Sequence, residues 1–179
     1  MKNNITIPAY LFLGLLLSSL VFSCNERPAP KPNPNSKELK ETMMKVNKNL
    51  VESENRDIEQ YIKRYGWEMK ETGTGLRYMI YKHGVGEKAA FGKIAKLNYK
   101  VGLLDGTQCY SSDENGPKVF RIGKGGVESG LEEGVLFLHV GDRAKFILPS
   151  HLAFGLVGDS KKIPAKAVLV YDIELIELK

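Results

Sequence analysis

The last third of the sequence, residues 123–179, most constrains what this chain can fold into. Glycines stand where the chain must turn, and a strand-like pattern resumes after each turn. The segment closes with apolar residues at alternate positions, which would line one face of a strand: Leu169, Tyr171, Ile173 and Leu175. This order of turn, short helix, strand, loop and strand predicts a sheet with one helix packed on it.

Earlier segments repeat the strand pattern with a period of two. The alternating sets are Leu76, Tyr78 and Ile80, and then Leu97, Tyr99, Val101 and Leu103. Asp105-Gly106 predicts a tight turn into a return strand over 107–111. The remaining predictions are a loop over 112–117, a strand over 119–122, a helix over 130–137, strands over 143–148 and 168–178, and a loop over 149–166. Together they predict an α+β fold in which a twisted antiparallel sheet wraps around one short helix.

The N-terminus has the features of an export signal. Met1 and Lys2 precede an apolar run over 5–22, and this run ends at Val21-Phe22-Ser23-Cys24. The ending resembles the lipobox of bacterial lipoproteins, in which the signal is cut before a cysteine that then carries the lipid. We therefore expect residues 1–23 to be a lipoprotein signal peptide and Cys24 to be lipidated. The alternative is a signal anchor with an incidental cysteine.

Two segments connect Cys24 to the sheet domain, which we place at residues 67–179. Residues 24–35 alternate proline with polar residues and predict a semi-rigid tether. Residues 36–66 predict one or two helices with an apolar stripe, and the polar stretch 47–55 is the expected weak point. The stripe either packs on the domain or joins the helices of two copies into a dimer.

Composition excludes several classes of function. The net charge of +5 is modest and forms no basic block, so no nucleic-acid partner is expected. Two cysteines and three scattered histidines predict no metal site, and no cofactor motif is present. Residues 123–126 are rich in glycine but lack the rest of a phosphate-binding loop, so they predict a turn into the helix. Glu132 and Glu133 are expected to be solvated acids near the helix N-terminus.

Residues 96–179 resemble the FK506-binding protein family of peptidyl-prolyl isomerases. The resemblance runs through Tyr99, Leu104-Asp105-Gly106, Phe120-Arg121-Ile122-Gly123, Val127, Gly130, Glu133-Gly134-Val135, residues 140–145, Ala153-Phe154-Gly155, Ile163-Pro164 and residues 169–175. With its lipobox and helical segment, the whole chain resembles the gliding-motility-associated isomerase lipoproteins of some Gram-negative bacteria.

The resemblance implies an apolar prolyl pocket that favours the twisted Xaa-Pro amide, so no nucleophile or titrating base is required. By resemblance, the pocket is lined by Tyr99, Phe120, Val127, Leu131, Phe154, Ile163 and Tyr171. The backbone N–H of Glu128 is expected to hydrogen-bond a carbonyl of the bound segment.

Five positions depart from the family pattern. The usual aromatic and acid of the return strand are Cys109 and Tyr110, an aromatic wall is Lys118, the tryptophan floor is Leu131 and the loop tyrosine is Phe154. Two functions therefore stay open. The first is a lipid-anchored isomerase that assists the folding of exported proteins by acting on their Xaa-Pro segments, facing the periplasm from a membrane, by resemblance the outer one. The second is a catalytically weak binding module, either a chaperone or a part of an envelope machine for motility or secretion.

Overall fold

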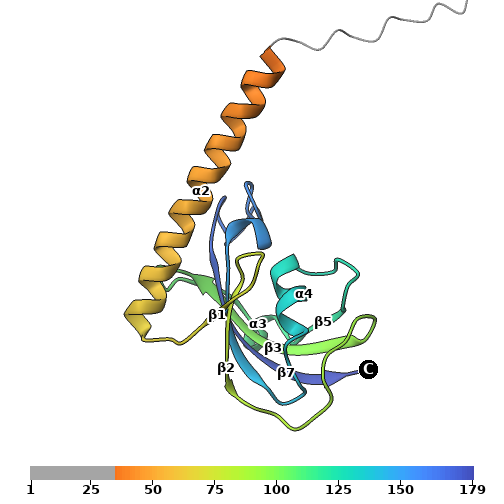
Figure 1. Cartoon of the computed structure of the whole chain (residues 1–179). Coiled ribbons are helices and arrows are strands. Elements are labelled where there is room, and N and C mark those ends of the chain that lie inside the picture. Colours follow the sequence, from red (N-terminus) through yellow and green to blue (C-terminus); the bar gives the residue numbers. More distant parts are fainter. Residues whose placement is uncertain (1–34) are drawn as a thin grey trace, which may run out of the picture. The chain divides into compact units, whose positions relative to one another are not determined.

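The computed structural model describes residues 35–179, beginning with the backbone of Asn35 (Figure 1). The predicted signal peptide, Cys24 and the tether up to residue 34 lie outside these residues. The elements are α2 (Asn35–Tyr65), β1 (Lys70–Glu71), β2 (Arg77–Lys82), β3 (Ile94–Leu103), β4 (Gln108–Ser111), α3 (Ser112–Asn115), β5 (Lys118–Arg121), α4 (Ser129–Val135), β6 (Arg143–Leu148), the 3-10 turn η1 (Ser150–Leu152) and β7 (Leu169–Leu178).

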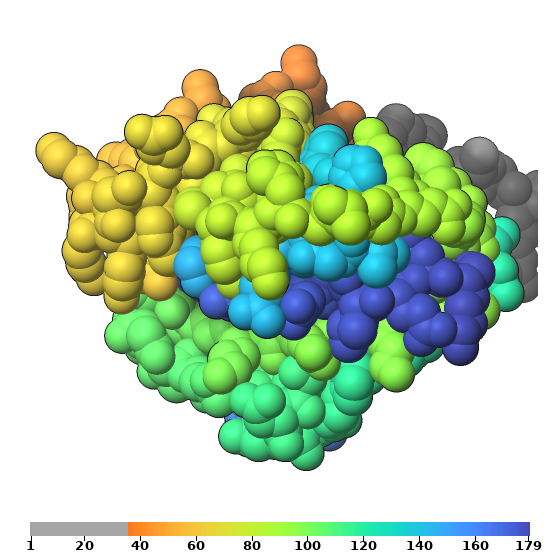
Figure 2. All heavy atoms as spheres, turned by 90° about the horizontal axis from the view of Figure 1, so that it is seen from below, coloured from red at the N-terminus to blue at the C-terminus, as the bar shows by residue number. Residues whose placement is uncertain are grey.

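Within residues 35–179, seven strands form one antiparallel sheet. The order is β1-β2-β6-β7-β3-β4, and β5 pairs with the first half of β3. The last strand, β7, is central and pairs with both β3 and β6, and Figure 2 shows part of it as a dark blue band beside the cyan β6. The structure confirms the α+β fold that the turn and strand pattern predicted.

One face of the sheet packs against the short helix α4. Alternate residues of β3, β6 and β7 point to this face and form the main apolar core with Leu131, Val135 and Leu138. Two glycines let the helix approach the sheet closely. A Cβ atom at Gly134 would lie 2.4 Å from Phe146, and one at Gly130 would lie 2.6 Å from Leu148.

The other face packs against the C-terminal part of α2. Ile58 and Tyr61 of this helix form a second apolar cluster with Ile147 of β6 and with Val168. The helix is continuous from Asn35 to Tyr65, so the polar stretch 47–55 does not break it. The stripe packs on the domain only in this part, because Met43 is 60% exposed and Val46 is 55% exposed.

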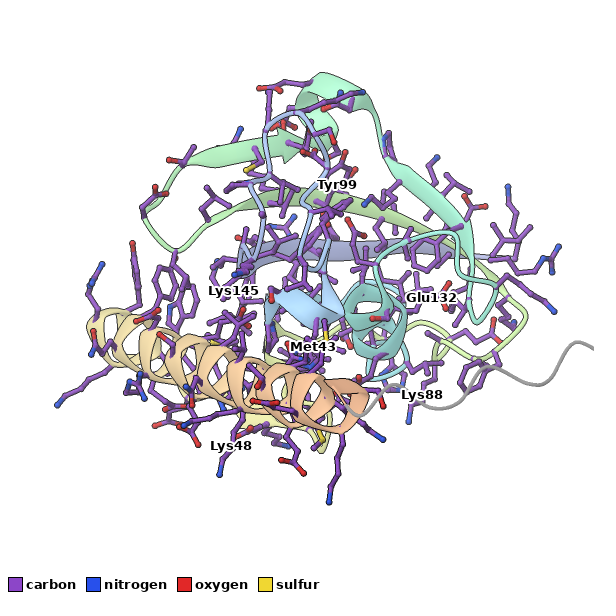
Figure 3. All side chains as sticks on the ribbon, turned by 90° about the horizontal axis from the view of Figure 1, so that it is seen from above. Met43, Lys48, Lys88, Tyr99, Glu132 and Lys145 are labelled. Carbon is purple, nitrogen blue, oxygen red and sulfur yellow. The ribbon has the colours of Figure 1, made fainter. Side chains whose placement is uncertain are left out.

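Long polar side chains also lie on the α2 face. In Figure 3, Lys145 is seen between helix and sheet, while Lys48 points away from them. The Lys145 ammonium lies 5.1 Å from the centre of the Trp67 ring and 5.3 Å from that of Tyr81. It also pairs with Asp172 at 2.8 Å. This charge is therefore held between aromatic faces and a carboxylate.

One local prediction is wrong, and one strand was not predicted. Residues 112–115 form the short helix α3 rather than a loop, because the Ser112 side chain is held by the backbone of Tyr99, from which its hydroxyl accepts a hydrogen bond at 3.1 Å. The pattern also did not predict β1, which pairs with β2 at the sheet edge. The turn at Asp105-Gly106 is confirmed, with Gly106 at a φ of 93° and its N–H donating to Leu103. No helix in residues 35–179 is both long and apolar enough to cross a membrane.

Candidate functional site: an apolar pocket beneath α4

The seven predicted pocket side chains converge in the structure. Five of them are buried in the main core: Tyr99, Phe120, Leu131, Ile163 and Tyr171. Val127 and Phe154 are partly buried and pack against that core. They come from β3, β5, β7, α4, the loop between β5 and α4, and the loop between η1 and β7. Only the folded chain therefore brings them together.

The sheet register places the two tyrosines side by side. Val101 of β3 lies opposite Tyr171 of β7, so Tyr99 and Tyr171 point to the same face two residues apart in register. Their ring centres are 6.5 Å apart. Phe120 joins them because Ala95, opposite it in the ladder between β3 and β5, faces the same core. These rings form the base of the candidate pocket.

The Glu128 side chain enters the pocket, which the sequence did not predict. Its carboxylate accepts a hydrogen bond from the Tyr171 hydroxyl at 2.8 Å, and the side chain is only 6% exposed. The Lys118 ammonium lies 3.3 Å from the same carboxylate. It also lies 5.2 Å from the centre of the Tyr99 ring and 5.7 Å from that of Tyr171. The sequence did hold a signal for this charge pair. Lys118 stands two residues before Phe120 in β5, so the two side chains point to the same face of the strand.

The carboxylate changes the titration of both tyrosines. Burial, followed by the charge of Glu128 and its hydrogen bond, raises the pKa of Tyr171 well above 10.0. Burial and the same charge also raise the pKa of Tyr99. Both hydroxyls are therefore protonated at neutral pH. They can donate hydrogen bonds but do not act as bases there.

The Glu128 backbone lies at the start of α4. Glu128 precedes the first residue of α4, and its carbonyl accepts hydrogen bonds from Leu131 and Glu132. Within residues 35–179, its N–H donates no hydrogen bond. A free donor of this kind beside an apolar pocket can bind a carbonyl of an extended segment.

A second acid, Asp159, is another residue that the sequence did not single out. Its carboxylate accepts hydrogen bonds from the Tyr110 hydroxyl and from the N–H groups of Lys161 and Ile163. Burial raises its pKa, but these hydrogen bonds outweigh burial and lower the pKa below 3.8. Asp159 thus fixes Ile163 in the pocket wall. The pairing of Asp159 with Tyr110 could not be predicted from the sequence, because the two residues are 49 positions apart.

The loop that carries Phe154 is anchored at its start by α2. The Glu54 carboxylate accepts hydrogen bonds from the N–H of Ser150 at 3.0 Å and from its hydroxyl. Ser150 and Glu54 are both buried. The Ser150 carbonyl in turn accepts the N–H of Gly155, which directly follows Phe154. The helix therefore positions one wall of the pocket.

The acids of α4, which were predicted to be solvated, also hold loops. Glu132 accepts a hydrogen bond from the N–H of Gly125 at 2.8 Å, and Figure 3 shows it on α4. Glu133 accepts one from the Thr74 hydroxyl at 2.7 Å. Residues 123–126 form the predicted turn, and Gly123 has a φ of 80°.

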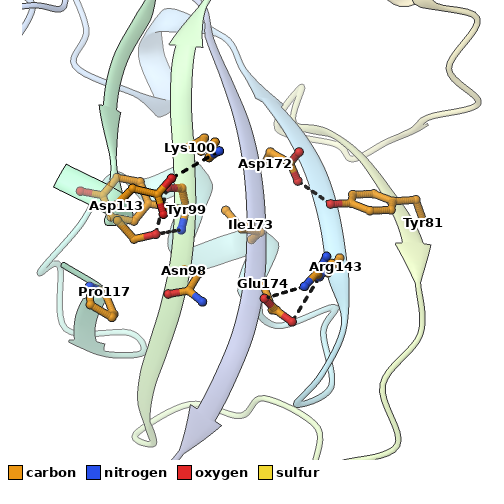
Figure 4. A pocket seen from close by; sticks show the side chains of 11 residues that line it. Tyr81, Asn98, Tyr99, Lys100, Asp113, Pro117, Arg143, Asp172, Ile173 and Glu174 are labelled. Atoms are coloured by element: carbon orange, nitrogen blue, oxygen red, sulfur yellow. Dashed lines mark hydrogen bonds and ion pairs between the residues drawn. The ribbon is translucent and has the colours of Figure 1, made fainter. Parts of the chain in front are cut away.

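A groove of about 480 Å³ leads to the candidate pocket. Its lining includes Lys118, Val127, Glu128 and Phe154. A second hollow of about 510 Å³ lies on the sheet between β2 and α3 (Figure 4). Its charged groups already have partners, since Arg143 pairs with Glu174, Tyr81 donates to Asp172 and Lys100 pairs with Asp113. The first groove is therefore the better candidate for binding an apolar segment.

A model of the FKBP-type peptidyl-prolyl cis-trans isomerase family matches residues 85–176, which is slightly more than half of the 179 residues. The chain belongs to this family. The matched range contains all eight predicted pocket residues.

Similar proteins agree with this family. The FKBP-type peptidyl-prolyl cis-trans isomerase FkpA of Aeromonas hydrophila is 39% identical over 143 residues, which cover 77% of this chain and 51% of that protein. A probable FkpA of Neisseria meningitidis is 38% identical over 62% of this chain and 40% of that protein. The chain therefore spans about half the length of these curated relatives.

The crystal structure of FkpA from Escherichia coli resembles this FKBP-type chain as well. The two share a TM-score of 0.62 and 26% sequence identity, over 98% of this chain and 84% of that one. The similarity reaches beyond the sheet domain into the preceding helix. Among residues 35–179, no group of three or more His, Cys, Asp or Glu side chains is arranged to hold a metal ion.

Proposed function

We propose that this protein is a peptidyl-prolyl cis-trans isomerase that acts on Xaa-Pro segments. The observation that carries the proposal is the convergence of seven apolar and aromatic side chains, among them the neighbouring rings of Tyr99 and Tyr171. Beside them, at the start of α4, lies the N–H of Glu128, which donates no hydrogen bond within residues 35–179. Family membership over residues 85–176 supports the same activity.

The pocket favours rotation through differential binding. The planar amide is conjugated, and about 18–20 kcal/mol opposes its rotation. The twisted amide has lost conjugation and charge separation, so an apolar pocket binds it more tightly than the planar form. The Glu128 N–H would hold a neighbouring carbonyl, which fixes the chain on one side of the rotating bond.

A coupled protease assay on short Xaa-Pro peptides tests this function. We expect Tyr99→Ala and Phe154→Ala to lower kcat/KM at least about tenfold, as loss of about 1.4 kcal/mol of transition-state binding would do. Tyr81→Ala is the matched control, because Tyr81 lies on the opposite face and donates to Asp172. Wild-type turnover in both pocket variants would show that the pocket is elsewhere.

The second candidate is a binding module with little turnover. Two observations favour it. Phe154 has no hydroxyl for a hydrogen bond to a ligand, and the Lys118–Glu128 pair covers the aromatic base. No turnover on any peptide, with undiminished suppression of client aggregation, would select this candidate over the isomerase. A fixed role in a motility or secretion machine is one form of it.

We further propose that the protein is exported and anchored by a lipid on Cys24, facing the periplasm from the outer membrane of a Gram-negative cell. The lipobox-like sequence at 21–24 supports this location, and the tether over 24–35 would hold the domain off the membrane. Metabolic labelling with palmitate tests it. Cys24→Ser should abolish labelling and release the protein from membranes, whereas unchanged labelling would refute the anchor.

The exposed part of α2 suits a second copy of the chain. Met43, Met44, Val46 and Val51 are large apolar residues that solvent reaches on this helix. We propose that two α2 helices pair through these side chains. Sedimentation of wild type and of Met43→Lys tests the pairing, since a lysine there should shift a dimer toward monomer.

A further inference from the structure

The base of the pocket is covered by other side chains, which matters if the protein is the isomerase proposed above. Tyr171 and Leu131 are almost wholly buried, and Tyr99 is nearly so. A prolyl ring could not reach the two tyrosine rings unless some atoms moved. The side chains lying against them therefore decide when the pocket is open.

Glu128 is one of the covering groups, and it is held firmly. Its carboxylate has the Tyr171 hydroxyl at 2.8 Å, and its backbone is fixed by two hydrogen bonds from the first turn of α4. A buried carboxylate also needs a nearby charge or further donors. Glu128 is thus part of the pocket wall and does not readily leave.

Lys118 is another covering group, and its side chain is more exposed than that of Glu128. Within residues 35–179, the hydrogen bonds of its ammonium go to Glu128, at 3.3 and 3.4 Å, and its cation–π contacts are with the Tyr99 and Tyr171 rings. Lys118 is the first residue of β5, and its side chain is 24% exposed, so its four-carbon stem already reaches solvent. The ammonium therefore lies over the two rings on which the proposed function would place the proline.

We propose that Lys118 is a gate over the prolyl pocket and, once displaced, the residue that selects an acidic side chain next to the proline. In the free protein its ammonium lies on the tyrosine rings and neutralises Glu128. A bound segment pushes it outward, toward the solvent that its side chain already reaches, while Glu128 keeps its hydrogen bond to Tyr171. There its charge has lost its partner, so an acidic neighbour of the proline regains an ion pair while a basic neighbour is repelled.

The test compares kcat and KM for three peptides with Glu, Leu or Lys before proline, at low and at high salt. For wild type we expect Glu over Leu over Lys, with an overall preference of about tenfold in kcat/KM that falls at high salt. In Lys118→Met the preference should disappear. The KM for the Leu peptide should fall about threefold, because a neutral stem no longer competes through an ion pair.

Two further variants keep the result interpretable. Lys124→Met removes the same charge from the turn before α4, outside the groove lining, and should retain the wild-type preference. If the unpaired Glu128 destabilises Lys118→Met, the double variant Lys118→Met/Glu128→Gln removes both charges and should show the same loss of preference.

The outcomes separate the gate from the function beneath it. The gate is refuted if both Lys118 variants keep the wild-type preference, or the wild-type KM for the Leu peptide, while Tyr99→Ala lowers turnover. In that case the isomerase function still stands. No turnover by wild type on any of the three peptides overturns the proposed function, and the gate with it.

Discussion

On the side of the sheet that carries α2, buried charges meet fixed partners, whereas on the side that carries α4 a buried charge meets a movable one. Glu54 is bound by the N–H and hydroxyl of Ser150, and Arg77 donates to Asn55 and to the carbonyl of Gly75. Glu128 instead depends on two side-chain groups, the Lys118 ammonium and the Tyr171 hydroxyl. A charge with backbone partners serves to join elements, because those partners cannot leave without local unfolding.

The contrast separates stability from function in the same fold. Removing a fixed partner should cost stability first and turnover second, through the shape of the pocket. Replacing the buried carboxylate of Glu128 by its neutral amide should alter binding while the fold stays nearly as stable. Four experiments test this difference, from the largest expected effect on stability to the smallest.

Glu54→Ala should cost the most. It leaves the Ser150 N–H and hydroxyl buried without a partner, and two hydrogen bonds to a charged group correspond to about 3 kcal/mol of unfolding free energy. Turnover should fall too, because the loop bearing Phe154 loses its anchor. Urea unfolding measures the loss. The control is Glu52→Ala on the exposed side of α2, and equal losses in both variants would contradict the assignment.

Gly134→Ala tests the close packing of α4 and should cost about 1–3 kcal/mol of unfolding free energy, as overpacked cores do. The added methyl group would lie 2.4 Å from the ring of Phe146, which is buried and has little room to move. Gly73→Ala is a matched control with no atom within 4 Å of the new Cβ. Urea midpoints that are equal for the two variants would show that the helix can shift freely.

Alkaline pH probes the tyrosines on the two sides. A raised folded-state pKa contributes stability that is complete below pH 10 and lost as pH rises through the folded value. Burial raises the pKa of Tyr171 well above 10.0, and that of Tyr61 on the α2 side to about 12. Urea unfolding between pH 9 and about 11.5 should therefore show a smaller loss of stability in Tyr171→Phe and in Tyr61→Phe than in wild type. The same slope in all three proteins would refute the buried, protonated hydroxyls.

Glu128→Gln should have the smallest effect on stability, within about 1 kcal/mol, because an amide oxygen can still accept the Tyr171 hydroxyl. Its effect on substrates should be larger than on the fold, since Lys118 loses its partner and leaves the rings more easily. Peptide KM values and urea midpoints, measured together, check this. A large loss of stability with unchanged KM would place Glu128 among the fixed charges.

Much of the fold followed from local patterns in the chain. Apolar residues alternate with a period of two in β3, β6 and β7, and a glycine stands at the turn at 106. Both features depend only on residues close together in the chain, so the strands and the turn could be predicted without knowledge of tertiary contacts. The apolar and aromatic pocket residues were found through resemblance and converged in the core. The helix at 112–115 and the edge strand β1 were not predicted because they have only four and two residues, too few for a period to show in the sequence.

The sequence by itself determined an antiparallel sheet around a short glycine-bounded helix, and it named the apolar side chains that meet there. Only the tertiary structure decided where the charged side chains lie. Glu128 is 10 residues from Lys118 and 43 residues from Tyr171 along the chain, and Glu54 is 96 residues from Ser150. Burial alternates with the local period of a strand, whereas the pairing of charges depends on which distant segments the fold brings within a few ångströms.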